Sequence, residues 1–293
     1  MVDRASSIRT LPASDYHDPA VHVVERDVIF GREWLCLGPT AAPSDPSGVT
    51  PPLVGWADLV PQEGRDRVAT ATWRGLRFAT VDPGAPNIEA WLGDEFVDRC
   101  AAFPVETWAA GPRLVHELAC NWKTYTDNYL EGYHIPFVHP ALARAIDVSS
   151  YVVEVHDGWV AHSAQARDGS VATGAWLYHW PNLALNFYEH GMSVERWFPT
   201  GPRTCALVLD FLFADTGHEA MVRNRLDVEA SARICVEDRV ICELVQRNLE
   251  SSAFDEGWLA PEHESALADF HRRVRRARGS GPLASRTGAQ PVV

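Results

Sequence analysis

NWKTYTDNYLEGYHIPFVHP, residues 121–140, is the most informative stretch of this sequence. It predicts a helix that ends near His134, because Pro136 has no backbone N–H and disfavours a helical conformation at the residue before it. His139 follows in the turn beyond. One histidine at a helix end and one in the next loop can converge on a single point, as a divalent transition metal requires. Two histidines at this spacing can also be ordinary surface or packed residues.

Two carboxylates precede the histidines. Glu131 lies three residues before His134, so a helix would place both side chains on one face. Asp127 lies four residues before Glu131 and continues the same stripe. This polar stripe makes Glu131 and Asp127 candidate catalytic residues beside a metal.

A third candidate ligand lies in a helix that is predicted from about Gly217 to Leu249. Asp238 falls in the middle of the apolar stripe of this helix. A buried carboxylate needs a partner, which can be a metal, an arginine or a shared proton. An ion pair with Arg239 or Arg196 therefore remains an alternative. Glu237 lies to the side of the stripe and is a weaker rival for the same role.

Two histidines and one carboxylate form the facial triad of non-haem Fe(II) oxygenases, which leaves coordination positions open for O₂ and water. Zinc hydrolases can use the same ligand set. The spacing of the three residues does not separate the two metals.

Composition limits the other possibilities. The chain has 293 residues, 46% of them apolar, and its 39 acidic and 26 basic residues give a net charge of −13. This balance argues against a nucleic-acid or anionic-membrane partner. The N-terminus has no apolar signal region, and the longest apolar run, residues 206–214, has only strand length. None of the six cysteines forms a CxxC pair, so we expect reduced, packed thiols and a cytoplasmic location.

Apolar alternation and turn residues predict an antiparallel meander rather than alternating βαβ units. Strands are expected at 68–81 (a hairpin that turns at Arg74-Gly75), 114–119, 151–155, 159–163, 183–188, 193–198 and 205–213. Helical patterns cover 21–37, 88–96, 217–249 and 262–278. Residues 39–66 are rich in Pro, Gly and Ser and are expected to form a long loop.

Residues 121–140 resemble the mononuclear-iron motif of Rieske-type ring-hydroxylating oxygenase α subunits, most closely the branch that oxidises choline, carnitine and glycine betaine. Four other stretches carry the resemblance, in the family's order: REWLCLG at 32–38, TWRGLRFATVDP at 72–83, WPNLALNFYEHGMSVERWFPTGP at 180–202 and VEDRVICELVQRNLES at 236–251. It spans about residues 20–265. The implied fold is α+β, a helix-grip (START/Bet v1-like) domain with an antiparallel sheet wrapped on a long C-terminal helix.

The resemblance also implies roles for individual residues. His134 and His139 match the two histidines that bind Fe(II) in the family, and Asp238 matches the carboxylate ligand. Glu131 matches the bridging carboxylate, which hydrogen-bonds an iron histidine and faces the electron-donating cluster of a neighbouring subunit.

The sequence departs from the family in one respect. A Rieske cluster takes its ligands from CxH and CxxH motifs in the family, and this sequence contains neither. We therefore expect no [2Fe-2S] cluster in this chain. We expect the chain to divide into residues 1–66, a remnant of the region that holds the Rieske domain in the family; residues 67–270, the mononuclear iron catalytic domain; and residues 271–293, a disordered tail.

These observations predict the catalytic subunit of a non-haem Fe(II) monooxygenase that uses O₂ to oxidise a small molecule, with an amine or a quaternary ammonium among the candidates. Electrons would come from a separate Rieske-bearing subunit or a ferredoxin and reductase, within a trimer-based hetero- or homo-oligomer. A non-catalytic structural or regulatory subunit is the alternative, and an enzyme that takes electrons from its substrate or from peroxide is a third. Four aromatic residues form a cation–π box or simply pack in the core: Trp176, Tyr178, Trp180 and Phe187.

Overall fold

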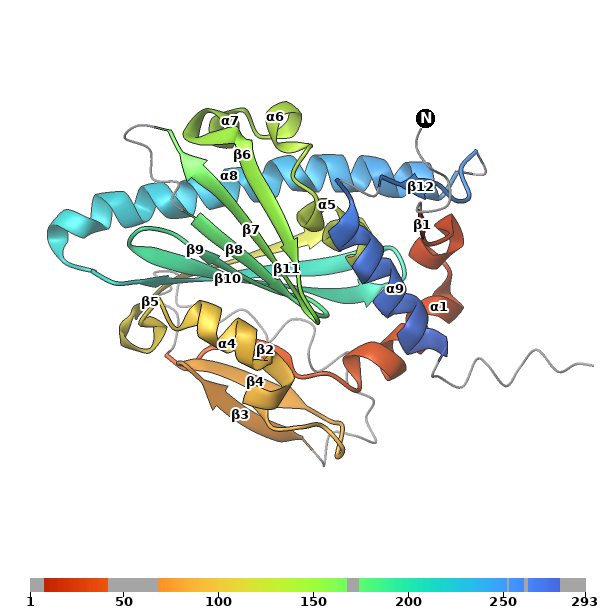
Figure 1. Ribbon diagram of the computed structural model, residues 1–293, viewed down its shortest axis with the longest axis horizontal. Coiled ribbons are helices and arrows are strands. Elements are labelled where there is room, and N and C mark those ends of the chain that lie inside the picture. The colour runs from red at the N-terminus through yellow and green to blue at the C-terminus, as the bar shows by residue number, and fades with distance from the viewer. Residues whose placement is uncertain (1–7, 42–67, 168–173, 252, 261–262, 280–293) are drawn as a thin grey trace, which may run out of the picture.

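The computed structural model describes residues 8–41, 68–167, 174–251, 253–260 and 263–279. Its centre is a seven-stranded antiparallel sheet with the strand order β5-β11-β10-β9-β8-β7-β6 (Figure 1). These strands are β5 (Ala109–Leu118), β6 (Ile146–Val155), β7 (Trp159–Ala166), β8 (Gly174–His179), β9 (Leu183–Phe187), β10 (Gly191–Gly201) and β11 (Thr204–Phe213). From β6 to β11 each strand pairs with the next one in sequence, so the predicted meander is confirmed. Strand β8 was not predicted.

A long helix, α8 (His218–Leu249), crosses one face of this sheet (Figure 1). A shorter helix, α5 (Trp122–Leu130), packs against both α8 and β10. The predicted α+β fold, an antiparallel sheet with a long C-terminal helix, is confirmed. In the described part of the chain, no helix is long and apolar enough to cross a membrane.

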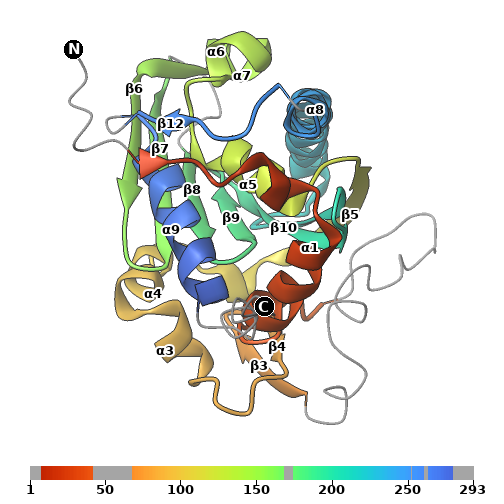
Figure 2. The same cartoon turned by 90° about the vertical axis from the view of Figure 1, so that its right-hand side faces the viewer.

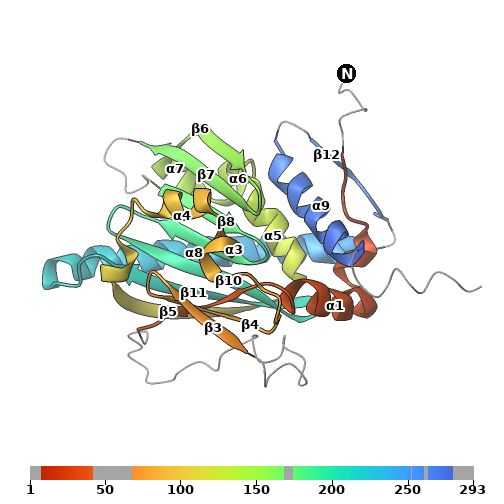
Figure 3. The ribbon, with the colours of Figure 1, turned by 60° about the horizontal axis from the view of Figure 1, so that its bottom comes forward.

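The opposite face of the large sheet carries a three-stranded sheet and two short helices (Figure 3). These elements are β2 (Leu35–Pro39), β3 (Ala69–Trp73), β4 (Leu76–Thr80), α3 (Ile88–Leu92) and α4 (Asp94–Cys100). The hairpin turn at Arg74-Gly75 is confirmed, and both residues have the positive φ of a tight primed turn, 46° and 78°. The single helix expected at 88–96 is two helices, which Gly93 separates with a φ of 83°.

Apolar side chains alternate across the strands and build a core on each face. On β9, Ala184 joins the cluster under α5 and α8, whereas Leu183 and Leu185 join the cluster under β2, β4 and α4. This alternation follows from the two-residue period of a strand. It also places every second residue of β7, β9 and β10 on the face that carries α5 and α8.

The N- and C-terminal segments close one end of the sheet (Figure 2). These elements are β1 (Ile8–Arg9), η1 (Ala13–Tyr16), α1 (Pro19–Glu25), the π-helical η2 (Arg26–Phe30), β12 (Trp258–Leu259) and α9 (Ser265–Gly279). The helical pattern predicted over 21–37 therefore ends at Phe30, and β2 begins at Leu35.

The expected disordered tail, residues 271–293, is wrong for residues 271–279, which belong to α9. His271 and Val274 are buried there, and Arg278 forms an ion pair with Asp15. These contacts outweigh the charge of the helix. Residues 280–293 lie outside the described part, as does most of the loop predicted at 39–66.

Candidate metal centre

The segment that follows α5 carries the two histidines. Asn121 caps this helix, since its side-chain oxygen accepts from the backbone N–H of Lys123 at 2.9 Å. The helix ends at Leu130, and Glu131 is extended, with φ −117° and ψ 155°. The predicted end near His134 is therefore wrong. Pro136 does not stop a helix; it lies in the first turn of α6 (Ile135–Val138), where a missing N–H leaves no hydrogen bond unmade.

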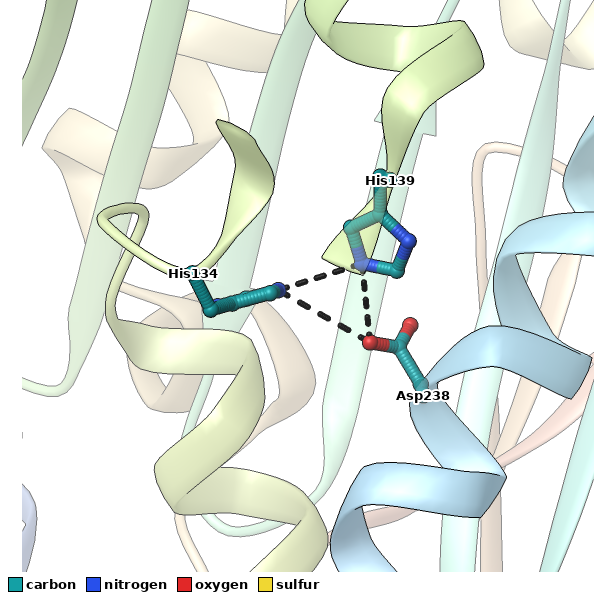
Figure 4. A group of neighbouring side chains, drawn as sticks. All are labelled: His134, His139 and Asp238. Carbon is teal, nitrogen blue, oxygen red and sulfur yellow. Dashed lines mark hydrogen bonds and ion pairs between the residues drawn. The ribbon is translucent and has the colours of Figure 1, made fainter. Parts of the chain in front are cut away.

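Three ligand atoms converge beside this turn: Nε2 of His134, Nε2 of His139 and Oδ1 of Asp238 (Figure 4). The two Nε2 atoms are 3.1 Å apart, and Oδ1 lies 2.9 Å from His139 and 3.7 Å from His134. Metal–ligand bonds of about 2.1 Å place neighbouring ligand atoms about 3.0 Å apart at right angles and about 3.4 Å apart in a tetrahedron. The three atoms therefore fit one face of a metal's coordination sphere.

Protons on the far side of each imidazole strengthen this fit. Nδ1 of His134 contacts Oε1 of Glu131, and Nδ1 of His139 lies 2.8 Å from Oε2 of Glu237. A carboxylate can only accept, so each Nδ1 carries the proton and each Nε2 presents a lone pair. Two imidazole lone pairs and a carboxylate oxygen then face one another at contact distance. They repel unless a cation lies between them, so the residues fit a bound metal.

Neighbouring side chains hold the third ligand. Asn128 Nδ2 donates to Asp238 Oδ1 at 2.8 Å. Arg196, one alternative ion-pair partner, is bonded to Asp210 instead. Glu237, the rival for the ligand role, binds the outer nitrogen of His139. Sequence reasoning missed the positioning roles of Glu237 and Asn128, although each lies next to a residue that was identified.

Asp127 does not belong to this group of residues. Its carboxylate accepts from Tyr16 Oη at 2.6 Å and lies 2.9 Å from His271 Nε2, at the side of α5 that packs against the terminal segments. The expectation that Asp127 and Glu131 share a helical face is wrong, because α5 ends before Glu131 and the backbone changes direction there. Asp127 ties α5 to the N- and C-terminal segments.

Comparison with known proteins places this geometry in a family. The profile of the family described as "Ring hydroxylating alpha subunit (catalytic domain)" matches residues 105–168 and 156–280. The chain belongs to this family. The match covers β5 to α9 and includes both histidines and Asp238.

Two curated relatives of this ring-hydroxylating family member are monooxygenases. The chain is 36% identical over 173 residues to the chloroplastic choline monooxygenase of Arabidopsis thaliana, which covers 54% of this chain and 40% of the relative. It is 27% identical over 215 residues to the carnitine monooxygenase oxygenase subunit of Escherichia coli (strain K12), which covers 68% and 54%. The chain thus spans about half the length of the curated relatives it matches.

Two solved structures share the fold of this chain. The quaternary ammonium Rieske monooxygenase CntA, in complex with an inhibitor, superposes with a TM-score of 0.78 at 20% identity, covering 94% of this chain and 97% of that one. Naphthalene 1,2-dioxygenase from Rhodococcus sp. gives a TM-score of 0.67 at 13% identity.

A cavity of about 470 Å³ adjoins the three ligand atoms. This volume is typical of sites that enclose a small molecule. Its wall comes from α5, α6, α8, the short helix α7 (Pro140–Ala145) and one face of the strands β6 to β11. Four of its aromatic side chains are Tyr129, Tyr151, Trp176 and Tyr188.

The cation–π box considered from the sequence is not formed by its four residues. Only Trp176 lines the cavity. Trp180 donates to Glu33, Phe187 stacks on Phe103 at 3.9 Å between ring centroids, and Tyr178 packs in the core against Trp197. Phe187 belongs to the core on the opposite face of the sheet, whereas Tyr178 and Trp180 lie on the face of the cavity but pack within its core. The aromatic wall of the cavity is therefore a different set.

Gly132 lies between Glu131 and the histidines and is pressed against Tyr151. A Cβ at this position would lie 2.1 Å from Cε1 and 2.6 Å from Cζ of the Tyr151 ring. Gly132→Ala is expected to displace the turn and to weaken Fe(II) binding about 10- to 100-fold, the range seen when support of a metal ligand is lost. Chelator competition under anaerobic conditions measures this change.

A second substitution separates this clash from other causes. Gly132→Ala combined with Tyr151→Ala has room for the added methyl group. Its affinity for Fe(II) should lie within about threefold of that of Tyr151→Ala alone, because the clash that causes the defect is absent from both variants. Unchanged affinity in Gly132→Ala would show that the turn tolerates the displacement.

Glu195 on β10 carries a carboxyl group that is buried in the cavity wall. Burial raises the pKa of Glu195 from 4.5 to about 7, so between these values the native state holds a proton that the unfolded chain has released. Stability from this group therefore falls as the pH rises through that window. Relative to wild type, Glu195→Gln is expected to gain about 2 to 3 kcal/mol between pH 5 and pH 8.

Urea unfolding of both metal-free proteins at the two pH values tests this expectation. For each protein, the free energy of unfolding at pH 5 is subtracted from that at pH 8. Any pH-independent effect of the glutamine side chain on stability cancels in this difference. Parallel pH profiles would contradict a raised pKa at Glu195.

Proposed function

We propose that this chain is the catalytic subunit of a non-haem Fe(II) monooxygenase that uses O₂ to oxidise a small molecule. The observation that carries the proposal is the convergence of His134, His139 and Asp238 beside a cavity of about 470 Å³. Bound Fe(II) would supply the activation of O₂, for which a facial triad leaves coordination positions open. An amine or a quaternary ammonium is the proposed substrate class, since the relatives named above act on choline and carnitine.

The chain's own side chains have distinct tasks in this proposal. Glu131 and Glu237 keep the Nδ1 protons of the two histidines and fix the direction of their Nε2 lone pairs. Asn128 fixes Oδ1 of Asp238. The aromatic wall of the cavity holds the substrate close to these atoms and limits the access of water.

Electrons would come from another protein. The sequence lacks the CxH and CxxH patterns, so we propose a Rieske-bearing subunit or a ferredoxin and reductase as the donor, in a trimer-based assembly. Glu131 is the proposed point of entry, because the segment that follows it exposes Tyr133 and Phe137. The division at residues 66 and 67 also remains a proposal, as does a cytoplasmic location. Strand β2 from the first part pairs with β4 from the second.

Anaerobic reconstitution with Fe(II), followed by nitric oxide, tests the proposal without a known electron donor. Nitric oxide occupies an open position on ferrous iron in place of O₂ and gives a characteristic half-integer-spin EPR signal. We expect about one iron per chain and this signal in wild type, and neither in His134→Ala. If the wild-type protein binds no iron, the result would instead support the alternative that this chain is a non-catalytic subunit. Oxygen uptake with dithionite-reduced Rieske proteins then identifies the donor.

A further inference from the structure

Glu195 faces the cavity from the middle of the large sheet. On β10 it lies opposite Ala184 of β9 and Leu209 of β11, and its side chain points to the face that carries α5 and α8. Only 5% of the residue is exposed, and it forms part of the cavity wall.

The groups around this carboxylate are hydrogen-bond donors. Tyr125 Oη donates to one oxygen and Asn186 Nδ2 donates to the other at 2.9 Å. The amide cannot turn over without loss, because its oxygen accepts from Tyr129 Oη at 2.6 Å. Both carboxylate oxygens are therefore held by donors, which is the arrangement that suits an ionised carboxylate.

The charge of Glu195 has no counter-ion in the described part of the chain. None of the ion pairs among these residues includes it, and burial raises its pKa to about 7. A buried carboxylate without a cation is costly, and such groups are concentrated at functional sites. The hydrogen bonds link α5, β9 and β10, but this structural task alone does not require a charge beside an open cavity.

The rest of the cavity favours a positive ligand as well. Glu131, Glu237 and Asp238 are engaged with the two histidines. Of the remaining charged residues that line the cavity in the described part of the chain, Asp227 and Glu195 are acidic, and Arg233 is the one arginine or lysine. The aromatic wall offers ring faces that attract cations: Tyr129, Tyr151, Trp176 and Tyr188.

We propose that Glu195 determines the specificity of this cavity by providing the negative charge against which a cationic nitrogen of the substrate binds. The inference rests on the proposed function, because it assigns a task within the same site. Both oxygens already accept hydrogen bonds from Tyr125 and Asn186, which hold the carboxylate in place. Glu195 acts through its charge in this proposal, so a quaternary nitrogen binds as well as a protonated amine.

Three alcohols of nearly the same shape test the proposal: choline, N,N-dimethylethanolamine and 3,3-dimethyl-1-butanol. Their nitrogen is quaternary, protonated or replaced by carbon. Binding to the anaerobic Fe(II)-loaded protein is measured by calorimetry at pH 8. We expect the two cations to bind within about threefold of each other and at least about tenfold more tightly than the neutral alcohol, as for a desolvated charge pair. In Glu195→Gln this preference should vanish.

Two further variants complete the experiment. Glu195→Asp keeps the charge and should retain part of the preference, which separates loss of charge from loss of folding. Asp227→Asn removes the other free carboxylate of the wall and should retain most of it. Equal binding of all three alcohols by wild type, or an equal loss in Asp227→Asn and Glu195→Gln, would overturn the assignment. Since no turnover is involved, an inactive protein that still prefers cations would refute only the oxygenase proposal.

Discussion

His139→Ala is expected to lower the affinity for Fe(II) by at least about 100-fold, because loss of a group that merely supports a ligand already costs about 10- to 100-fold. The imidazole is buried, and its Nε2 lies within 3.1 Å of both other ligand atoms. Chelator competition under anaerobic conditions measures the affinity. Thermal unfolding gives an independent measure, since Fe(II) at 100 times its dissociation constant stabilises the native state by about 2.7 kcal/mol.

Two matched variants define the expected order of effects. Glu237→Gln keeps the shape of the side chain that holds Nδ1 of His139 and should cost about 10- to 100-fold. Asp127→Asn changes a carboxylate of α5 that binds Tyr16 and His271, and it should leave the affinity unchanged. An equal loss in Asp127→Asn and His139→Ala would mean that the metal is not held where the three ligand atoms meet.

The sequence singled out the three candidate ligand residues whose side chains converge in the structure, but it did not reveal the chain path between them. Asp238 could be found because a carboxylate in an apolar helical stripe requires a partner. The helix end was misplaced because Pro136 was taken as a stop signal. Proline is equally suited to the first turn of a new helix, and the sequence alone does not separate these uses. The mistaken placement of Asp127 beside Glu131 has the same cause, because it assumed that the helix continued past Leu130.

In the fold, too, features set by local sequence were predictable and features set by long-range contacts were not. The hairpin at Arg74-Gly75 was predictable, because Gly75 readily takes the positive φ that a tight hairpin turn requires. The sequence-based prediction assigned the second half of α9 to a disordered tail, because this segment contains many arginines. Its order comes from long-range contacts, such as Leu11 N donating to Nδ1 of His271 at 3.2 Å, which no local pattern reveals.

One such long-range contact supports the helix that leads to the metal centre. Lys123, in the first turn of α5, is fully buried, and its Nζ donates to Oε2 of Glu25 at 2.6 Å. Trp122 Nε1 donates to the same oxygen at 3.0 Å. Burial lowers the pKa of Lys123, and the charge and hydrogen bond of Glu25 oppose this shift.

Glu25→Ala is expected to destabilise the protein by about 3 to 5 kcal/mol, because it leaves the lysine charge buried without its partner. Lys123→Met should cost less. The remaining carboxylate keeps Trp122 as a donor and has Arg278 at 3.9 Å. Urea unfolding of the metal-free proteins gives both values.

The double variant Lys123→Met with Glu25→Leu decides what the ion pair contributes. Replacing both charges by apolar groups of similar size removes their desolvation cost together with their attraction, so the double variant should be more stable than Glu25→Ala by at least about 2 kcal/mol. A double variant as unstable as Glu25→Ala would mean that packing between α1 and α5, rather than an uncompensated charge, accounts for the loss. If the charge is responsible, Glu25→Ala should also weaken Fe(II) binding, because α5 then loses the contact that fixes its first turn to the N-terminal segment.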